Sequence, residues 1–154
     1  MQSIAEKLAA LGFPIGAPPA PGAIYKPVVV VGRIAYVSGA VPNDGERLVY
    51  RGKVPSEVGL EDAKKAAVLC AANNLRMVHH EVGPLEAVKR VIRVTGYVNS
   101  DPNFVEQHLV INGASELLLN VFGDEGVGAR SALGMAQLPL GSAVETEMIL
   151  ELKE

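Results

Sequence analysis

A stripe of small and apolar residues at helical spacing limits most strongly what this chain can fold into. The stripe runs from about Leu60 to Glu81, and Gly83-Pro84 ends it. Its members are Ala63, Ala66, Ala67, Cys70, Ala71, Asn74, Leu75 and Val78. Because small side chains allow a close approach, the pattern predicts a helix that lies against a sheet.

Stretches with strand character lie on both sides of this predicted helix. Residues 28–37 form two β-branched runs around Gly32-Arg33, which predicts a tight hairpin. Residues 88–98 alternate apolar and polar side chains and predict a longer strand, whereas 48–53 is a candidate for a short third strand.

Two further helices are predicted, a short amphipathic one over residues 3–11 and a long one over 103–122. The elements then follow the order ββ(β)αβαββ. We expect a single domain over residues 1–154, in which residues 1–22 form an N-terminal helix and loop extension. Strands grouped at both ends of the chain predict an α+β fold, with two helices packed on one face of a mixed sheet.

The C-terminal stretch, residues 128–148, predicts a β-hairpin that turns at Pro139-Leu140. Strand alternation then places Arg130 on one face of the hairpin. Glu145 falls on the same face, about one diagonal step from Arg130. A cation and a carboxylate above small residues form either a small-molecule site or an ordinary solvated ion pair.

The second face of the predicted sheet has no helix to cover it. It would carry Val29, Val31 and small residues of 132–136, together with glutamates of the last strand. One chain cannot bury such a face, so a closed homo-oligomer that uses it is expected.

Composition narrows the classes of function. The 154 residues carry 14 Lys and Arg against 17 Asp and Glu, a formal net charge of −3, and no basic stripe interleaved with aromatic residues. Nucleic acid is therefore not an expected partner. No apolar run approaches the ~20 residues that span a bilayer, and the N-terminal residues lack the layout of a signal peptide. We expect a cytoplasmic protein with no membrane partner.

Several catalytic patterns find no match in the sequence. His79 and His80 are adjacent and point in different directions, and His108 stands alone, so no metal site is predicted. Cys70 lies within the helical stripe, which favours a buried structural thiol. The chain has neither a glycine-rich phosphate loop nor a G-x-S-x-G nucleophile elbow.

A series of short motifs follows along the chain at a specific spacing. They are Gly32-Arg-Ile-Ala-Tyr-Val-Ser-Gly39, Gly52-Lys-Val, Val94-Thr-Gly-Tyr-Val-Asn-Ser-Asp-Pro-Asn-Phe104, Ala129-Arg-Ser131, Leu138-Pro139 and Val144-Glu145. Together they resemble the YjgF/RidA family of reactive-intermediate deaminases, whose older names are L-PSP endoribonucleases and translation inhibitors. The resemblance covers residues 23–154, and the insertion near 73–86 is similar to a longer, less characterised branch.

The resemblance implies a chorismate-mutase-like fold and a homotrimer, with the sheets forming an inner barrel and three clefts between subunits. It implies an enamine/imine deaminase that hydrolyses small 2-imino acids to 2-keto acids and ammonia without a metal or organic cofactor. A non-catalytic trimer that binds small carboxylates or acts in regulation is the alternative. Ribonuclease activity rests on the older names, and the acidic charge counts against it.

The same resemblance implies roles for individual residues. Arg130 would hold the substrate carboxylate, and Glu145 would orient the attacking water. The planar guanidinium suits a carboxylate, and holding the imine carbon beside that water lowers the barrier. The implied substrate-binding residues are Tyr25, Ser38, Gly39, Asn112, Arg130 and Ala132.

Two positions depart from the family pattern. Ala40 stands where many members have glutamine, and Ala132 stands where many have cysteine. The second change enlarges the pocket but leaves Arg130 in place, so carboxylate binding should survive while the substrate preference shifts.

Overall fold

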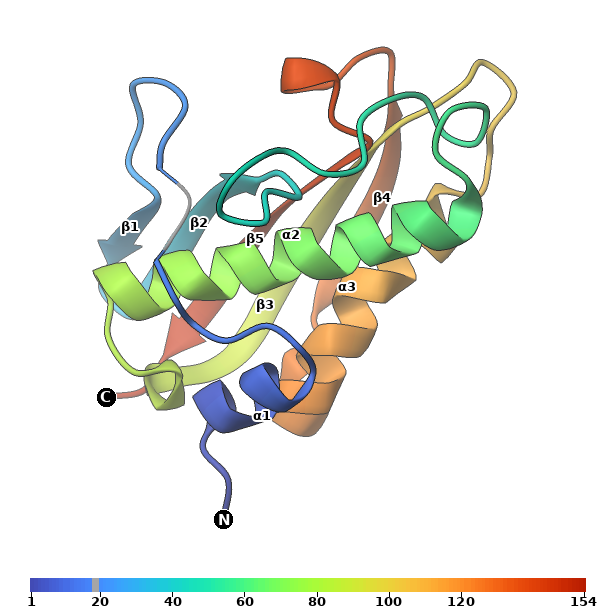
Figure 1. Cartoon of the computed structure of the whole chain (residues 1–154). Helices are drawn as coiled ribbons and strands as arrows, with labels where there is room; N and C mark the ends of the chain where they lie inside the picture. The colour runs from blue at the N-terminus through green and yellow to red at the C-terminus, as the bar shows by residue number, and fades with distance from the viewer. Residues whose placement is uncertain (18–19) are drawn as a thin grey trace.

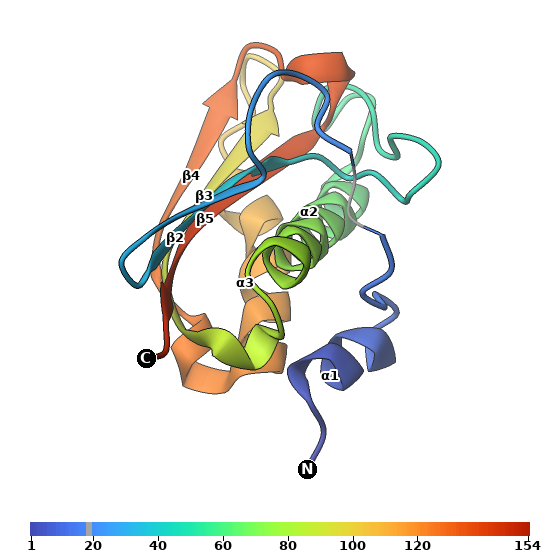
Figure 2. The same ribbon diagram turned by 90° about the vertical axis from the view of Figure 1, so that its left-hand side faces the viewer.

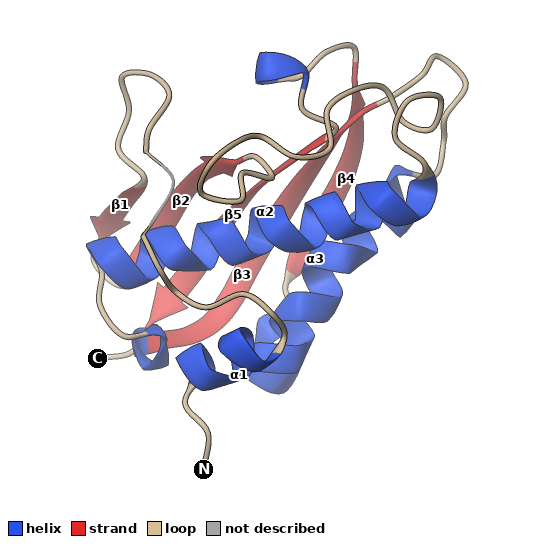
Figure 3. Ribbon diagram, viewed as in Figure 1, coloured by secondary structure: helices blue, strands red, loops and turns tan. Residues whose placement is uncertain are grey.

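In the computed structural model, which describes residues 1–17 and 20–154, five strands form one mixed sheet in the order β1-β2-β5-β3-β4. The strands are β1 (Val28–Val31), β2 (Ile34–Ala40), β3 (Val88–Asn99), β4 (Ala129–Met135) and β5 (Val144–Leu152). Two long helices, α2 (Leu60–Glu81) and α3 (Gln107–Phe122), pack together across one face (Figures 1 and 3). Figure 2 shows the sheet edge-on, with both helices on one side of it. The predicted α+β fold class is confirmed.

Helix α2 has the predicted bounds, and its small residues lie close to the sheet. The Cys70 thiol is within 3.5 Å of the Val144 carbonyl oxygen, and Thr146 donates a hydrogen bond of 2.7 Å to the Asn74 side chain. Glycine makes the packing of α3 equally close. A Cβ atom added to Gly113 would overlap the carbonyl oxygen of Lys64 on α2. The buried core therefore lies between α2, α3 and one face of the sheet.

Local patterns predicted the N-terminal elements well. Helix α1 (Ile4–Ala10) forms within the predicted range and lies against α3 in Figure 1. Strands β1 and β2 pair as an antiparallel hairpin around Gly32, whose φ of 60° suits glycine. Three short 3-10 helices follow later in the chain, at Leu85–Ala87, Gly123–Gly126 and Pro139–Gly141.

The stretch 48–53 does not form the third strand that its sequence suggested. Isolated bridges occur there in place of a ladder. Tyr50 has a φ of 58° and Gly52 a φ of 125°, and two such left-handed positions break an extended strand. Helix α3 begins at Gln107, four residues later than its predicted start at 103.

The predicted C-terminal hairpin is wrong. Strand β4 pairs in parallel with β3, and β5 lies between β2 and β3, antiparallel to both. The reason lies in the preceding helix, because β3, α3 and β4 form a strand–helix–strand crossover that aligns its two strands in parallel. Strand β5 buries every second residue and fits the centre of the sheet, which leaves β4 at the edge.

This topology places Arg130 and Glu145 on opposite faces of the sheet. Arg130 is the ladder partner of buried Val94 and faces the helices, whereas Glu145 is the partner of Tyr97 and faces away from them. The expected diagonal pairing of the two charges is therefore wrong. Ala132 lies on the side of Arg130 and packs against the core, so it does not belong to the uncovered face either.

The uncovered face is nonetheless rich in apolar side chains. Val29, Val31, Tyr36 and Leu133 keep between 43% and 63% of their surface exposed. No helix of the described residues shields them, as Figure 2 illustrates. Apolar clustering of this kind is typical of a surface that binds a partner.

Candidate functional site

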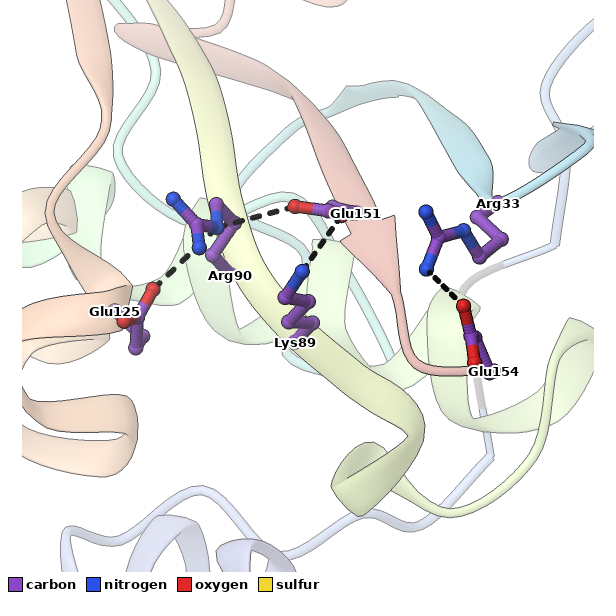
Figure 4. A network of polar contacts seen from close by, with 6 residues as sticks. All are labelled: Arg33, Lys89, Arg90, Glu125, Glu151 and Glu154. Atoms are coloured by element: carbon purple, nitrogen blue, oxygen red, sulfur yellow. Dashed lines mark hydrogen bonds and ion pairs between the residues drawn. The ribbon is translucent and has the colours of Figure 1, made fainter.

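The glutamates of β5 on the uncovered face have very different surroundings. Glu151 accepts a hydrogen bond from Lys89 Nζ at 3.0 Å and forms an ion pair with Arg90, whose Nε lies 3.1 Å from Glu151 Oε2 and 3.5 Å from Glu125 Oε2. Figure 4 shows this network beside the separate pair of Arg33 and Glu154. The Lys89 hydrogen bond is the main cause that lowers the pKa of Glu151. Such exposed pairs contribute little stability and already satisfy their charges.

Neither Glu147 nor Glu145 forms an ion pair with a residue of 1–17 or 20–154, although Arg93 and Glu147 line the same small pocket. Glu147 accepts a hydrogen bond from the Tyr97 hydroxyl. Within residues 1–17 and 20–154, Glu145 has neither an ion-pair partner nor a hydrogen-bond donor to its carboxyl group. Burial is the main cause that raises the pKa of Glu145, and the negative charge of Glu147 adds to it. Glu145 is thus a half-buried carboxyl group with a raised pKa.

Glu145 lies in a cleft of about 620 Å³. The wall is formed mainly by small or apolar residues of the loop before β1, of β2, and of the turn before β5. The lining residues are Ala20, Gly22, Ala23, Tyr25, Ser38, Gly39, Ala40, Val41, Asn43, Met77, Tyr97, Pro139, Leu140, Glu145 and Glu147. No lysine or arginine occurs among them, so the cleft supplies carboxylates but no cation of its own.

Three of the predicted binding residues therefore lie together with Glu145. Gly39 approaches it most closely, since a Cβ atom there would be 3.0 Å from Glu145 Cδ and Oε1. The Ser38 hydroxyl donates to the carbonyl oxygen of Lys26 at 2.6 Å, which ties the incoming loop to β2. Tyr25 lies directly before Lys26 in that loop and is 45% exposed.

The other predicted residues form a second group around Arg130. The Arg130 Nη1 atom donates to Asn112 Oδ1 at 2.8 Å and to Ser115 Oγ at 3.2 Å, and Nη2 donates to the His108 carbonyl oxygen at 3.2 Å. All three acceptors belong to α3 or its first turn and are uncharged. Among the described residues no carboxylate lies within 4 Å of this guanidinium. Two of its five N–H donors have no acceptor there, which leaves them for an anion.

The structure thus forms two half-sites rather than one site. The cleft around Glu145 includes neither Arg130 nor Asn112, because β3 separates β4 from β5 and the two charges face opposite sides. Sequence reasoning missed Tyr97 and Glu147 in the cleft. The antiparallel register of β3 and β5 is what brings Tyr97 opposite Glu145, and a correct strand order would have revealed it.

Several other features of the described residues complete the survey. No three histidine, cysteine, aspartate or glutamate side chains in residues 1–17 and 20–154 gather as metal ligands. Cys70 is fully buried, and burial raises the pKa of its thiol. Across those same ranges, every helix is too short or too polar to cross a bilayer.

Comparisons with known proteins agree with this fold. A family model described as "YjgF/chorismate mutase-like, putative endoribonuclease" matches residues 5–152. The chain belongs to the YjgF/RidA family. The proteins that it is similar to include Protein TCP17 of Trypanosoma cruzi, which is 39% identical over 150 residues, or 97% of this chain and 94% of that protein.

Two solved structures are similar over almost the whole chain. A protein of unknown function from Agrobacterium tumefaciens is 42% identical, with a TM-score of 0.91 over 99% of this chain and 94% of that one. A Shewanella oneidensis protein that carries the endoribonuclease name is 26% identical, with a TM-score of 0.93 over 98% of this chain and 100% of that one. The resemblance to the YjgF/RidA family inferred from the motifs is confirmed.

Proposed function

We propose that this protein is an imine deaminase that hydrolyses small 2-imino acids to 2-keto acids and ammonia. The observation that carries the proposal is the pair of unsatisfied charges. Among residues 1–17 and 20–154, the acceptors of the Arg130 guanidinium are all neutral, and the half-buried Glu145 carboxyl group has no ion-pair partner. A 2-imino acid offers the complement to both, since it has a carboxylate next to an electrophilic carbon.

The proposal requires two subunits for each site, because one chain holds the two charges on opposite faces. We propose a homotrimer in which the uncovered sheet faces turn inward. Val31 and Tyr36, exposed on that face, support burial by a partner. Arg130 lies on the edge strand β4, where a neighbouring subunit can bring its own Glu145 cleft alongside.

The chemistry then follows from the two groups. Arg130 of one subunit holds the substrate carboxylate with its two remaining donors. The imine reacts in its protonated form, and the Glu145 carboxylate of the next subunit takes a proton from water as the oxygen–carbon bond forms, which gives a neutral carbinolamine. Glu145 then gives that proton to the amine nitrogen. The carbon–nitrogen bond breaks as the hydroxyl oxygen forms the keto group, and Glu145 passes the hydroxyl proton to the departing ammonia, which leaves as ammonium. A raised pKa suits a carboxyl group that both takes and returns a proton.

Ammonia release from freshly generated imines tests the proposal. An amino-acid oxidase would supply the 2-imino acid, and the disappearance of imine would be followed by a competing trap such as semicarbazide. We expect the wild-type protein to accelerate hydrolysis and Arg130→Ala to lower kcat/KM by about 100-fold. Arg33→Ala is the matched control, because it removes an exposed arginine paired with Glu154.

Two results would contradict the deaminase proposal. Full activity in Arg130→Ala would mean that the substrate is not held there. Binding of 2-keto acids through Arg130 without turnover of any imine would indicate the alternative function, a small-carboxylate binder or regulatory trimer.

A further inference from the structure

One tyrosine distinguishes the two carboxyl groups of the cleft. Tyr97 on β3 is the cross-strand partner of Glu145 on β5, yet its hydroxyl donates to Glu147, two residues further along the same face of β5. We propose that Tyr97 and Glu147 are positioning residues that make Glu145 the proton-carrying carboxyl group of the cleft. This inference rests on the proposed function, in which Glu145 transfers the proton.

The first argument is the hydrogen bond itself. A carboxylate that accepts a hydrogen bond is favoured in its charged form, and a second carboxylate nearby is then disfavoured as an anion. Glu147 has the Tyr97 donor, whereas Glu145 has no donor among the described residues. A proton shared between the two groups is therefore held by Glu145. Enzymes that use two carboxyl groups for different roles separate them by such differences in surroundings.

The Tyr97 hydroxyl keeps its proton, and so remains a hydrogen-bond donor, at the pH values used in assays. The hydrogen bond to Glu147 is the main cause that raises the pKa of Tyr97 to about 12, with burial and the charges of Glu147 and Glu145 adding to it. Tyr97 consequently keeps its proton in every assay buffer. Its hydroxyl donates to Glu147, and a pKa this high does not suit an acid–base group near neutral pH.

Within one chain, the other described elements around Glu145 bring no cation to it. Strand β2 contributes Ser38 and Gly39, and the loop before β1 contributes the phenol of Tyr25. From α2, behind the sheet, the Cys70 thiol faces the β5 backbone and remains protonated, because burial and the charge of Glu145 raise its pKa. Arg93 lies four residues before Tyr97 on β3 and donates to Ser131 at 2.6 Å. Its charge lowers the pKa of Tyr97 and is not among the causes that shift the pKa of Glu145. Among the described residues, Glu147 is thus the one charge that acts on the Glu145 carboxyl group.

The proposal predicts the direction of two substitutions. Glu147→Gln removes the neighbouring charge, so the pKa of Glu145 should fall. Tyr97→Phe removes the hydrogen bond that holds the Glu147 carboxylate in the cleft. That carboxylate can then turn away from Glu145, so the titration midpoint of Glu145 should fall as well. Because burial remains as the larger cause, we expect a partial fall of the Glu145 midpoint for Glu147→Gln and a smaller one for Tyr97→Phe.

The direct test is a titration of glutamate side-chain carboxyl carbons by NMR, in the full-length protein labelled with ¹³C. The Glu145 midpoint should fall in Glu147→Gln and in Tyr97→Phe. Glu151→Gln is the matched control, because Glu151 lies on the same strand and face but is paired with Lys89 and Arg90. The acidic limb of the kcat/KM profile for imine hydrolysis should shift in the same direction.

An unchanged Glu145 midpoint in either variant would overturn the proposal, and so would an equal change in Glu151→Gln. Thermal unfolding of each variant shows whether it is folded, and any variant that fails is replaced by Glu147→Ala or Tyr97→Leu. The titration needs no turnover. A protein without deaminase activity would therefore contradict the proposed function and still show the two midpoint shifts.

Discussion

Replacing Gly39 by alanine perturbs the cleft with little effect on the rest of the fold. The new Cβ atom would lie 3.0 Å from Glu145 Cδ and Oε1 and 3.3 Å from Cγ. Carbon atoms in contact prefer a separation of about 3.5–4.0 Å, so the carboxyl group must move by roughly 0.5–1 Å. Gly39 does not have a left-handed φ, and its backbone therefore accepts alanine. The atoms that must move are the flexible end of one side chain.

These facts separate the effect on activity from the effect on stability. A displacement of that size in a group that must meet water and substrate costs about 100-fold in rate. The free energy of unfolding should change by no more than about 1 kcal/mol, because neither backbone strain nor a core overlap arises. Steady-state kcat/KM for imine hydrolysis and urea unfolding of the same sample measure the two effects.

Gly59→Ala is the matched control for Gly39→Ala. No atom lies within 4 Å of a Cβ added at Gly59, and its φ of −66° accepts alanine. We expect this variant to keep its activity. Full activity in Gly39→Ala would refute the reasoning that Glu145 acts from its observed position. A loss of activity that only parallels a loss of stability would refute it too.

Two further predictions concern stability. Because the pKa of Glu145 is raised above its ordinary value of 4.5, the folded state binds more protons than the unfolded state between the two values, and stability falls as pH rises through that window. Glu145→Gln should therefore be more stable than wild type at pH 8 and gain nothing at pH 4 in urea unfolding; an equal effect at both pH values would contradict this. Gly113→Ala should destabilise the fold by about 1–3 kcal/mol, because its overlap with the Lys64 carbonyl oxygen outweighs a helix-propensity gain of about 1 kcal/mol. Alanine at exposed Asn120 on the same helix should be nearly neutral, and a stabilised Gly113→Ala would show that α2 and α3 are not so closely packed.

Local sequence patterns predicted the elements that depend on local interactions. The small-residue stripe predicted the bounds of α2, because helical spacing and the Gly83-Pro84 terminator depend on residues only a few turns apart. The β1–β2 hairpin depends on one tight turn at Gly32. The stretch 48–53 failed for an equally local reason, because its residues have left-handed backbone angles that composition does not reveal.

Strand order was the part that local patterns could not predict. Two strands close in sequence suggested a hairpin, but the crossover through α3 places β4 beside β3 and leaves the central position to β5. Arg130 and Glu145 remain predicted site residues. Their relative placement, and the position of Tyr97 opposite Glu145, depend on contacts distant in sequence.

The most direct test of the central claim, that Arg130 and Glu145 of different subunits share one site, is complementation between two inactive variants. Arg130→Ala and Glu145→Gln chains would be co-expressed with different tags, and mixed oligomers purified through both. In a trimer that contains both chains, one of the three interfaces joins a native Arg130 to a native Glu145, whichever chain is present twice. We therefore predict that mixed oligomers recover about one third of the wild-type activity. Mixed oligomers as inactive as either variant alone would show that both residues serve the same subunit, and would contradict the account.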